Sequence, residues 1–358
     1  IQDRVRFIHN RRNLFFAKGC NRGAWAARGE NIVFLNNDTL VKPGWLDELL
    51  RPVEADQTVG IVGNKQVFPD SHASCANHVW HAGMVIGEDK LPWHVCYGFD
   101  PEHPLVNRER DCVSVSGCCL LIRRRLFEQL GGFDPHFQNG FEDVDLCLRA
   151  GELGYRIVYA PRSEIVHYVS SSESRFDREK ENLEKFKARW ADRLVPDEMQ
   201  FYREAGLLPS ASGDRAIRVG VVSAFNQECS TSYYAEALMA EYPADSYVVL
   251  SEFGIRDRGA RQDSASVLRC WDRGGTWYYP LLRWATALEL DPIHVNFDHF
   301  LFPSGFLEVL AALKHAGKRV VVTFHETSRN TPLLALVSQL ADSVIVDTPQ
   351  NRMELILA

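Results

Sequence analysis

The residues best suited to chemistry are Asn36-Asn37-Asp38-Thr39, which directly follow the apolar run 32–35. An unbroken apolar run of this length favours a strand buried in a parallel sheet, and open α/β sheets bind ligands at the carboxyl ends of such strands. A carboxylate there can hold a hard cation beside a phosphate, so Asp38 is a candidate metal ligand. The same residues could instead only form the turn before a helix that starts near Pro43.

A second polar cluster contains Glu142, Asp143 and Asp145, at the start of a helical pattern. Acidic residues at a helix N-terminus cap free amides and interact favourably with the helix dipole, which accounts for one or two of them. Three carboxylates in four residues exceed what capping needs. A strand expected at 155–159 then delivers His167 to the loop that follows it, so the sequence predicts several ionisable groups at one edge of a sheet.

Aromatic residues are concentrated in the irregular stretch 69–110, where Trp80 and Trp93 could stack on the faces of sugar rings. The alternative is that these rings only pin the loop to the core. Gly117 lies inside the apolar stretch 112–122, which we expect to form a buried strand. An interior glycine in a strand commonly marks the close approach of a ligand or of another backbone.

The elements that must position these residues alternate between strands and helices, which is typical of an α/β fold with a doubly wound sheet. In the first half we expect strands at 4–8, 32–35, 60–68, 112–122 and 155–159, and helices at 17–29, 43–53, 126–132, 142–154 and 173–193. The stretch 207–216 has linker composition. We therefore expect a domain boundary near residue 212, with domains at 1–212 and 213–358.

The second half predicts a further α/β domain with the strand-loop-helix order of a Rossmann-like sheet. Strands are expected at 217–222, 246–250, 294–297, 319–323 and 343–346, with helices between them. No complete glycine fingerprint follows the first of these strands, so dinucleotide binding is poorly supported.

The length, net charge and cysteine content of the chain limit the classes of function that it could have. The chain has 358 residues, enough for two domains, and a formal net charge of -7, which argues against nucleic acid as the main partner. Nine cysteines without CxxC pairing indicate reduced thiols in a cytoplasmic setting. The sequence starts at Ile1 inside a strand-like segment and stops inside the helical pattern 351–358, and we interpret it as a fragment.

Residues 4 to about 195 resemble the family 2 glycosyltransferases of the GT-A fold. The resemblance rests on the order and spacing of NIVFLNNDTLVKPGW, VSGCCLLIRRRLFEQLGGFD and FEDVDLCLRAGELGYRIVYAP, followed by His167. It implies a metal-dependent, inverting transfer of a sugar from a nucleotide-sugar donor to an acceptor hydroxyl. The strand and loop that begin the family's fold and bind the nucleotide base have no counterpart in the sequence.

On the donor side, the resemblance implies that Asp38 and His167 hold a divalent cation, Mn²⁺ or Mg²⁺, on the diphosphate. Asn36 would contact the sugar or phosphate, and Asn21 and Gly23 would support the nucleotide pocket. These roles come from the family pattern.

On the acceptor side, the resemblance implies that Asp143 is the general base and that Glu142 beside it contacts the acceptor. We assign Gly117, Trp80 and Trp93 to the acceptor site as well. Attack by a hydroxyl on the anomeric carbon leaves a nucleoside diphosphate with extra negative charge, which a divalent cation offsets while a carboxylate accepts the proton.

Residues 217–358 resemble the amino-terminal half of family 4 glycosyltransferases of the GT-B fold. The matching segments are RVGVVSAFNQECSTSYYAEAL, HVNFDHFLFPSGFLEVL and KRVVVTFHET. The resemblance makes His325 and Glu326 pocket candidates, although they could equally cap a strand end. The donor-binding half of that fold is missing, so no second catalytic site is complete.

The sequence thus predicts two fused glycosyltransferase domains that act in polysaccharide or glycan biosynthesis. The expected partners are a nucleotide-sugar donor and a glycan or lipid-linked acceptor. We expect a cytoplasmic location, with peripheral association at the inner face of the membrane. The alternatives are a sugar-phosphate nucleotidyltransferase, which would carry a glycine-rich phosphate loop, and a non-catalytic glycan-binding scaffold.

Overall fold

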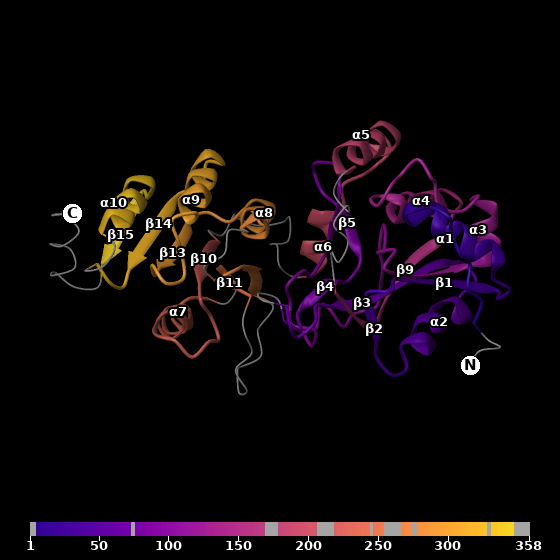
Figure 1. Cartoon of the computed structure of the whole chain (residues 1–358). Coiled ribbons are helices and arrows are strands. Elements are labelled where there is room, and N and C mark those ends of the chain that lie inside the picture. Colours follow the sequence, from indigo (N-terminus) through magenta and orange to yellow (C-terminus); the bar gives the residue numbers. More distant parts are fainter. Residues whose placement is uncertain are drawn as a thin grey trace. The chain divides into compact units, whose positions relative to one another are not determined.

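A computed structural model describes residues 5–72, 76–168, 178–205, 218–243, 246–253, 266–273, 278–327 and 331–346. The chain forms two compact α/β units (Figure 1). Unit 1 comprises Ile1–Pro69, Val79–Cys96 and Val106–Glu198, and unit 2 comprises Asp70–His78, Tyr97–Leu105 and Met199–Ala358. Two short loops from the first half of the chain therefore belong to unit 2. The expected boundary near residue 212 and the helical pattern 351–358 lie outside the described residues.

Unit 1 is built on a mixed sheet with the strand order β1-β8-β3-β9-β2. These strands are β1 (Asn31–Leu35), β2 (Thr39–Val41), β3 (Val59–Val67), β8 (Cys119–Arg123) and β9 (Arg156–His167). β3 and β9 run parallel, while β1, β8 and β2 pair antiparallel with their neighbours. β4 (Val79–His81) adds to β3, and β7 (Arg110–Asp111) adds to β9.

The expectation that the run 32–35 lies within a parallel sheet is wrong. In the described part of the chain, β1 pairs only with β8, and that pairing is antiparallel. The run is apolar because helices cover both faces of the sheet. Ile32 and Phe34 pack into one cluster, whereas Val33 between them packs against the cluster on the other face.

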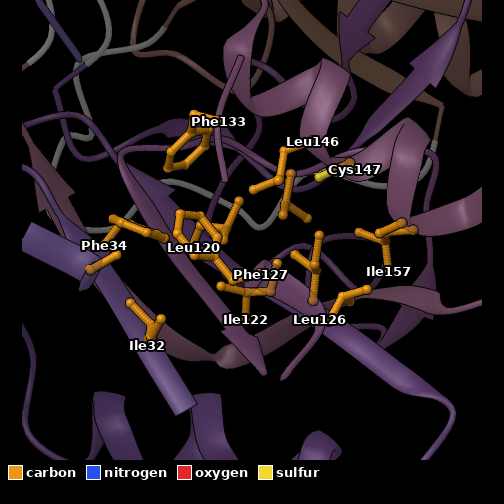
Figure 2. Close-up of a cluster of buried hydrophobic side chains, with 14 of the residues drawn as sticks. Ile32, Phe34, Leu120, Ile122, Leu126, Phe127, Phe133, Leu146, Cys147 and Ile157 are labelled. Carbon is orange, nitrogen blue, oxygen red and sulfur yellow. The ribbon is translucent and has the colours of Figure 1, made fainter. Parts of the chain in front are cut away.

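The two faces of this sheet are covered by different helices. α1 (Phe15–Ala26), α3 (Arg124–Gln129) and α4 (Glu142–Glu152) cover one face, and α2 (Trp45–Ala55) covers the other (Figure 1). Figure 2 shows the first of these clusters, in which Phe34 from β1, Phe127 from α3 and Leu146 from α4 point into a common core. α5 (Glu179–Trp190) and α6 (Glu198–Glu204) follow the sheet in sequence.

Several predicted boundaries in unit 1 differ from the structure. Residues 5–8 form no strand. The strand expected at 112–122 begins only at Cys119, so Gly117 lies in the preceding turn. β9 continues past Pro161 to His167, because the pairing of β3 with β9 shifts between Asn64 and Lys65 and leaves the proline out of the ladder. This extension carries His167 to the sheet edge beside β2.

The stretch 69–110 contains a regular hairpin that the sequence did not predict. β5 (Met84–Ile86) and β6 (Pro92–His94) pair antiparallel. Met84 faces His94 in this pairing. The hairpin places the aromatic and imidazole side chains of this stretch on a defined framework.

Unit 2 is a six-stranded parallel sheet with the order β12-β11-β10-β13-β14-β15. The strands are β10 (Val219–Ser223), β11 (Tyr247–Glu252), β12 (Val267–Trp271), β13 (Ile293–Phe297), β14 (Val320–Phe324) and β15 (Ser343–Val346). α7 (Ser230–Ala240) lies on one face, and α8 (Tyr279–Ala287), α9 (Phe306–His315) and α10 (Thr331–Leu340) lie on the other (Figure 1). The chain reverses its winding between β10 and β13, the position at which doubly wound sheets bind ligands.

Eight cysteines in the described part are free thiols, while Cys75 lies outside it. Among the helices that the structure describes, none has the length and apolar character needed to cross a membrane.

Candidate functional site

The turn that carries Asp38 joins β1 to β2 and is tied to two other segments. The Asn36 amide donates to the Cys118 carbonyl at 2.8 Å, and the Thr39 hydroxyl closes the turn by donating to the Asn36 carbonyl at 2.7 Å. The Tyr168 amide donates to the Asp38 carbonyl at 2.9 Å. These hydrogen bonds close the turn locally. They also connect it to the residue before β8 and to the residue after β9.

His167 reaches Asp38 through the pairing of β2 with β9. This pairing sets His167 opposite Thr39, and the imidazole Nε2 lies 3.6 Å from Oδ2 of Asp38. The His167 side chain is 3% exposed and the Asp38 side chain 22% exposed, so the pair is sheltered but open on the carboxylate side.

Asp143 lies in the first turn of α4, and the residue before this helix, Phe141, has a left-handed backbone with φ of 70°. Its Oδ2 accepts a hydrogen bond from the Gly117 amide at 2.7 Å. A Cβ on Gly117 would lie 3.1 Å from the Asp143 Cβ and 3.2 Å from the Phe16 ring, so this position favours glycine. The close approach at Gly117 is thus made by the side chains of Asp143 and Phe16.

The other two carboxylates of this cluster have different surroundings. Glu142 is buried, and its Oε2 accepts the Gly140 amide at 2.6 Å. Burial, together with the charge of Glu142, raises the pKa of the nearby Cys20 thiol to about 12. Asp145 is fully buried and accepts hydrogen bonds from Arg149, Arg189 and Trp190 at 2.7, 2.8 and 3.0 Å. Asp145 therefore has a structural role. This role explains why the start of α4 contains one more carboxylate than helix capping needs.

These elements enclose a cavity of about 500 Å³ in unit 1. Its lining includes seven of the residues proposed from the sequence, namely Asn36, Asp38, Trp80, Gly117, Glu142, Asp143 and His167. The cavity therefore combines carboxylates from the β1–β2 turn and from α4 with an imidazole from β9 and an indole from β4.

Three of the residues proposed for unit 1 are not part of this lining. The side-chain amide of Asn21 donates to the Phe133 carbonyl at 2.8 Å, and its oxygen accepts the Phe133 amide at 2.9 Å, so Asn21 fastens α1 to a loop. Gly23 is an open position of α1, where an added Cβ would meet no atom within 4 Å. The Trp93 indole donates to Asp89 at 3.0 Å, which holds it at the tip of the hairpin. The hydrogen bonds of Asn21 and Trp93 thus hold local structure, whereas Gly23 borders open space.

Other lining residues were not singled out from the sequence. They include His94, Met84 and Pro92 on the β5–β6 hairpin, Phe16 on α1 and Asn182 on α5. The cluster of histidines and tryptophans between residues 78 and 94 was the available signal, but sequence spacing alone could not tell which rings face the cavity.

Asp38 and His167 form the candidate metal-binding pair. Within the described ranges, no group of three or more His, Cys, Asp or Glu side chains could hold a metal ion. One carboxylate and one imidazole fit a cation that takes its remaining ligands from a bound diphosphate and from water. Because an imidazole suits first-row transition metals better than Mg²⁺, this donor set favours Mn²⁺.

The candidate residues of unit 2 follow β14. The His325 ring lies 4.5 Å from the Tyr234 ring of α7, in an edge-to-face arrangement, while Glu326 is exposed. Thr323 is buried and lies 2.8 Å from Nε2 of His294. Burial, and to a smaller extent His325, lowers the pKa of His294. The buried polar groups near the ends of β13 and β14 are therefore neutral, whereas Glu252 at the end of β11 is buried and forms an ion pair with Arg273.

Comparisons with known proteins find relatives of the first half of the chain. The sequence profile described as "Glycosyltransferase like family 2" matches residues 2–192, which is more than half of the chain. The O-antigen biosynthesis protein RfbC of Myxococcus xanthus is 38% identical over 158 residues, covering 41% of this chain and 12% of that protein. The N-acetylglucosaminyl-diphospho-decaprenol L-rhamnosyltransferase of Mycobacterium tuberculosis is 32% identical over 152 residues, covering 40% of this chain and 48% of that protein.

The matches thus span less than half of each relative's length. Among solved structures, the crystal structure of GalNAc-T7 with UDP, GalNAc and Mn²⁺ is 15% identical and covers 65% of this chain and 46% of that chain. Its TM-score of 0.37 is below the level at which a shared fold can be inferred.

Proposed function

The chain belongs to glycosyltransferase family 2, and we propose that unit 1 is a GT-A domain that transfers a sugar from a nucleotide-sugar donor to a hydroxyl of a glycan or lipid-linked acceptor. One observation carries the proposal. Asp38, Asp143 and His167 come from three distant segments and line one cavity of about 500 Å³. A cavity of this size accommodates a small-molecule substrate.

On the donor side, Asp38 and His167 would hold a divalent cation, Mn²⁺ or Mg²⁺. When bound, the cation offsets the negative charge that develops on the departing nucleoside diphosphate. Asp38 presents its partly exposed carboxylate to the cavity, and the buried His167 lies behind it. Asn36, whose backbone is fixed by Cys118, lies at the same turn and can contact a sugar or phosphate oxygen.

On the acceptor side, Asp143 acts as the general base. As the acceptor oxygen attacks the anomeric carbon, the Asp143 carboxylate takes the hydroxyl proton, and the bond from that carbon to the diphosphate breaks. This one-step displacement inverts the anomeric centre. The Gly117 amide fixes Oδ2 of Asp143, and a positioned base typically contributes about 10²- to 10⁴-fold in rate.

Glu142 and Trp80 complete the acceptor side. Glu142 is held by the Gly140 amide and contacts the acceptor beside the base. The Trp80 ring packs against Phe68 with centroids 5.4 Å apart, so it is a fixed surface on which a sugar can stack. Because lipid-linked acceptors lie at a membrane, we place the reaction in the cytoplasm at the inner membrane face.

For unit 2 we propose a Rossmann-like domain corresponding to the amino-terminal, acceptor-binding half of a GT-B glycosyltransferase. The parallel order β12-β11-β10-β13-β14-β15 supports this proposal. His325 and Glu326 follow β14 and remain its pocket candidates. Replacing His325 by Ala should weaken glycan binding measured by saturation-transfer NMR, and unchanged binding would rule out a contact with His325.

The decisive experiment for unit 1 is a screen of the protein against a panel of nucleotide sugars with Mn²⁺ or Mg²⁺, in which nucleoside diphosphate release is measured. Transfer to an acceptor supports the proposal. Formation of a nucleotide sugar from a sugar phosphate would instead indicate a nucleotidyltransferase. Glycan binding without any turnover would indicate a scaffold.

A further inference from the structure

His94 on β6, which lines the cavity, is directly bonded to His81 on β4. Nδ1 of His81 lies 2.9 Å from Nδ1 of His94, and the two rings meet edge to face with centroids 4.9 Å apart. His81 is fully buried, whereas His94 lines the cavity.

The other nitrogen of His81 fixes its protonation state. Nε2 of His81 accepts hydrogen bonds from the backbone amides of Gly83 and Ser116, both at 3.2 Å. Backbone amides can only donate, so Nε2 must carry a lone pair. His81 is therefore neutral, with its proton on Nδ1. Burial, together with the positive charge that His94, Arg110 or His167 can carry, lowers the pKa of His81 and agrees with this state.

The tautomer of His94 follows from that of His81. Nδ1–H of His81 donates to Nδ1 of His94, so that nitrogen of His94 must be an acceptor. When His94 is neutral, its proton is on Nε2. Trp80 also restrains this ring, because the Trp80 and His94 centroids are 5.0 Å apart. His94 therefore presents a donor of fixed orientation.

We propose that Nε2–H of His94 donates a hydrogen bond to an oxygen of the bound donor or acceptor, and that His81 is the positioning residue that sets the tautomer of His94. The inference rests on the proposed function of this cavity. The Nε2–H donor of His94 complements the carboxylates of Asp38 and Asp143, which can only accept hydrogen bonds when ionised. A neutral donor also binds a sugar oxygen without adding a cation that would lower the basicity of Asp143.

The alternative is that the pair only fastens the hairpin to the turn before β8, because His81 bonds to Ser116. Two substitutions of His94 separate these roles. In His94→Gln the side-chain amide can reach the position of Nε2, whereas in His94→Asn it can reach only the position of Nδ1. The Asn variant can keep the contact with His81 but loses the donor to the substrate.

Kinetics of both variants provide the first test. We expect kcat/KM for transfer to fall about 10-fold in His94→Asn, the value of one lost hydrogen bond of roughly 1.4 kcal/mol, and to be largely restored in His94→Gln. If His94→Asn has a larger acceptor KM but unchanged donor hydrolysis, the oxygen that accepts the His94 hydrogen bond belongs to the acceptor. If donor hydrolysis is slower, that oxygen belongs to the donor. Equal rates in the two variants would overturn the proposal.

The second test does not depend on turnover. Long-range ¹H–¹⁵N spectra of the full chain with ¹⁵N-labelled histidine should show His81 protonated on Nδ1 and His94 on Nε2 at neutral pH. In His81→Phe, the His94 signals should become those of a tautomer mixture. A His94 protonated on Nδ1 in the wild type overturns the inference. Correct tautomers in a protein without activity on any nucleotide sugar would count against the proposed function alone.

Discussion

The two units both place polar side chains at the carboxyl ends of sheet strands, but the chemistry of these side chains differs. In unit 1, Asp38 follows β1 and His167 ends β9, and both line a cavity together with Asp143 from the first turn of α4. In unit 2, Ser223, Asn296 and Thr323 occupy the matching places on three strands. All three are fully buried and neutral.

The difference between the units lies in charge. In unit 1, the Asp143 carboxylate accepts a hydrogen bond from the Gly117 amide, and the Asp38 carboxylate lies 3.6 Å from His167. Both carboxylates line the cavity, where they can act on a substrate or cation. In unit 2 the polar row carries no charge, so it suits structure or the binding of a neutral group. We expect group transfer in unit 1 only.

The largest expected effect comes from Asp143→Asn. The amide cannot accept a proton at neutral pH, so kcat for transfer should fall by about 10²- to 10⁴-fold while donor affinity changes little. Transfer rates and calorimetric titration with the donor would measure the two quantities. Asp192→Asn, which removes an exposed charge, is the matched control. A collapse of donor affinity would place Asp143 in the donor site instead.

The next effect concerns Asp38→Asn. Loss of the only carboxylate in the proposed metal pair should raise the Mn²⁺ concentration needed for half-maximal transfer by at least about 10-fold. A Mn²⁺ titration of the transfer rate would measure this shift. Asp47→Asn, an exposed acidic position on α2, is the control. An unchanged Mn²⁺ requirement would show that Asp38 is not a ligand, and the contrast between the units would then rest on Asp143.

Much of the unit 1 site could be predicted from the sequence because its parts are local. The apolar run before Asp38 and the acidic start of α4 are each recognisable within a few residues. The role of Asn21 could not be predicted, because its two hydrogen bonds reach Phe133, 112 positions away. The bonded pair likewise exists only once the fold has brought His81 on β4 to His94 on β6.

Unit 2 shows a different cause of error. The sequence prediction missed β12, whose segment VLRCW contains Arg269. In the structure this buried guanidinium donates to the Ser251 hydroxyl and to the carbonyls of Glu252 and Phe225. A charged residue thus occupies β12, a buried strand at the end of the described sheet, because partners from neighbouring strand ends satisfy it, which a local pattern cannot reveal.

A third prediction separates two carboxylates within one helical turn. Asp145→Asn should lower the free energy of unfolding of unit 1 by about 2 kcal/mol, because it weakens charge-assisted bonds to Arg149 and Arg189. Its effect on kcat should be small compared with that of Asp143→Asn. Denaturant unfolding and transfer rates measure the two effects. A catalytic loss without a stability loss would mean that Asp145 also takes part in chemistry.

Acidification should lower the free energy of unfolding of unit 1. Burial opposes ionisation of Asp134, but hydrogen bonds from His136 and Arg189 lower its pKa to about 2. A depressed carboxyl pKa stabilises the folded state above the unfolded pKa of about 4. This stabilisation is lost as the pH falls from about 4 to 2. Asp134→Asn should flatten that part of the curve of stability against pH, and an unchanged curve would exclude Asp134 as the source.

The smallest effect is expected at Asn296 in unit 2. Within the described part of the chain, neither the nitrogen nor the oxygen of its buried amide has a hydrogen-bond partner. Asn296→Leu removes the desolvation cost of that amide, so unit 2 should keep its stability or gain up to about 1 kcal/mol, with transfer by unit 1 unchanged. Hydrogen exchange of β10 and β13 amides would measure the stability.

Thr323→Val is the matched variant for this test, because Thr323 shares the row but contacts His294 at 2.8 Å. It should destabilise unit 2 by about 1 kcal/mol through the loss of that contact. If Asn296→Leu were as destabilising as Thr323→Val, the Asn296 amide would have a stabilising partner such as a bound water. If Asn296→Leu instead abolished glycan binding, the neutral row would be a ligand site. The two units would then differ in the charge of the ligands that they bind.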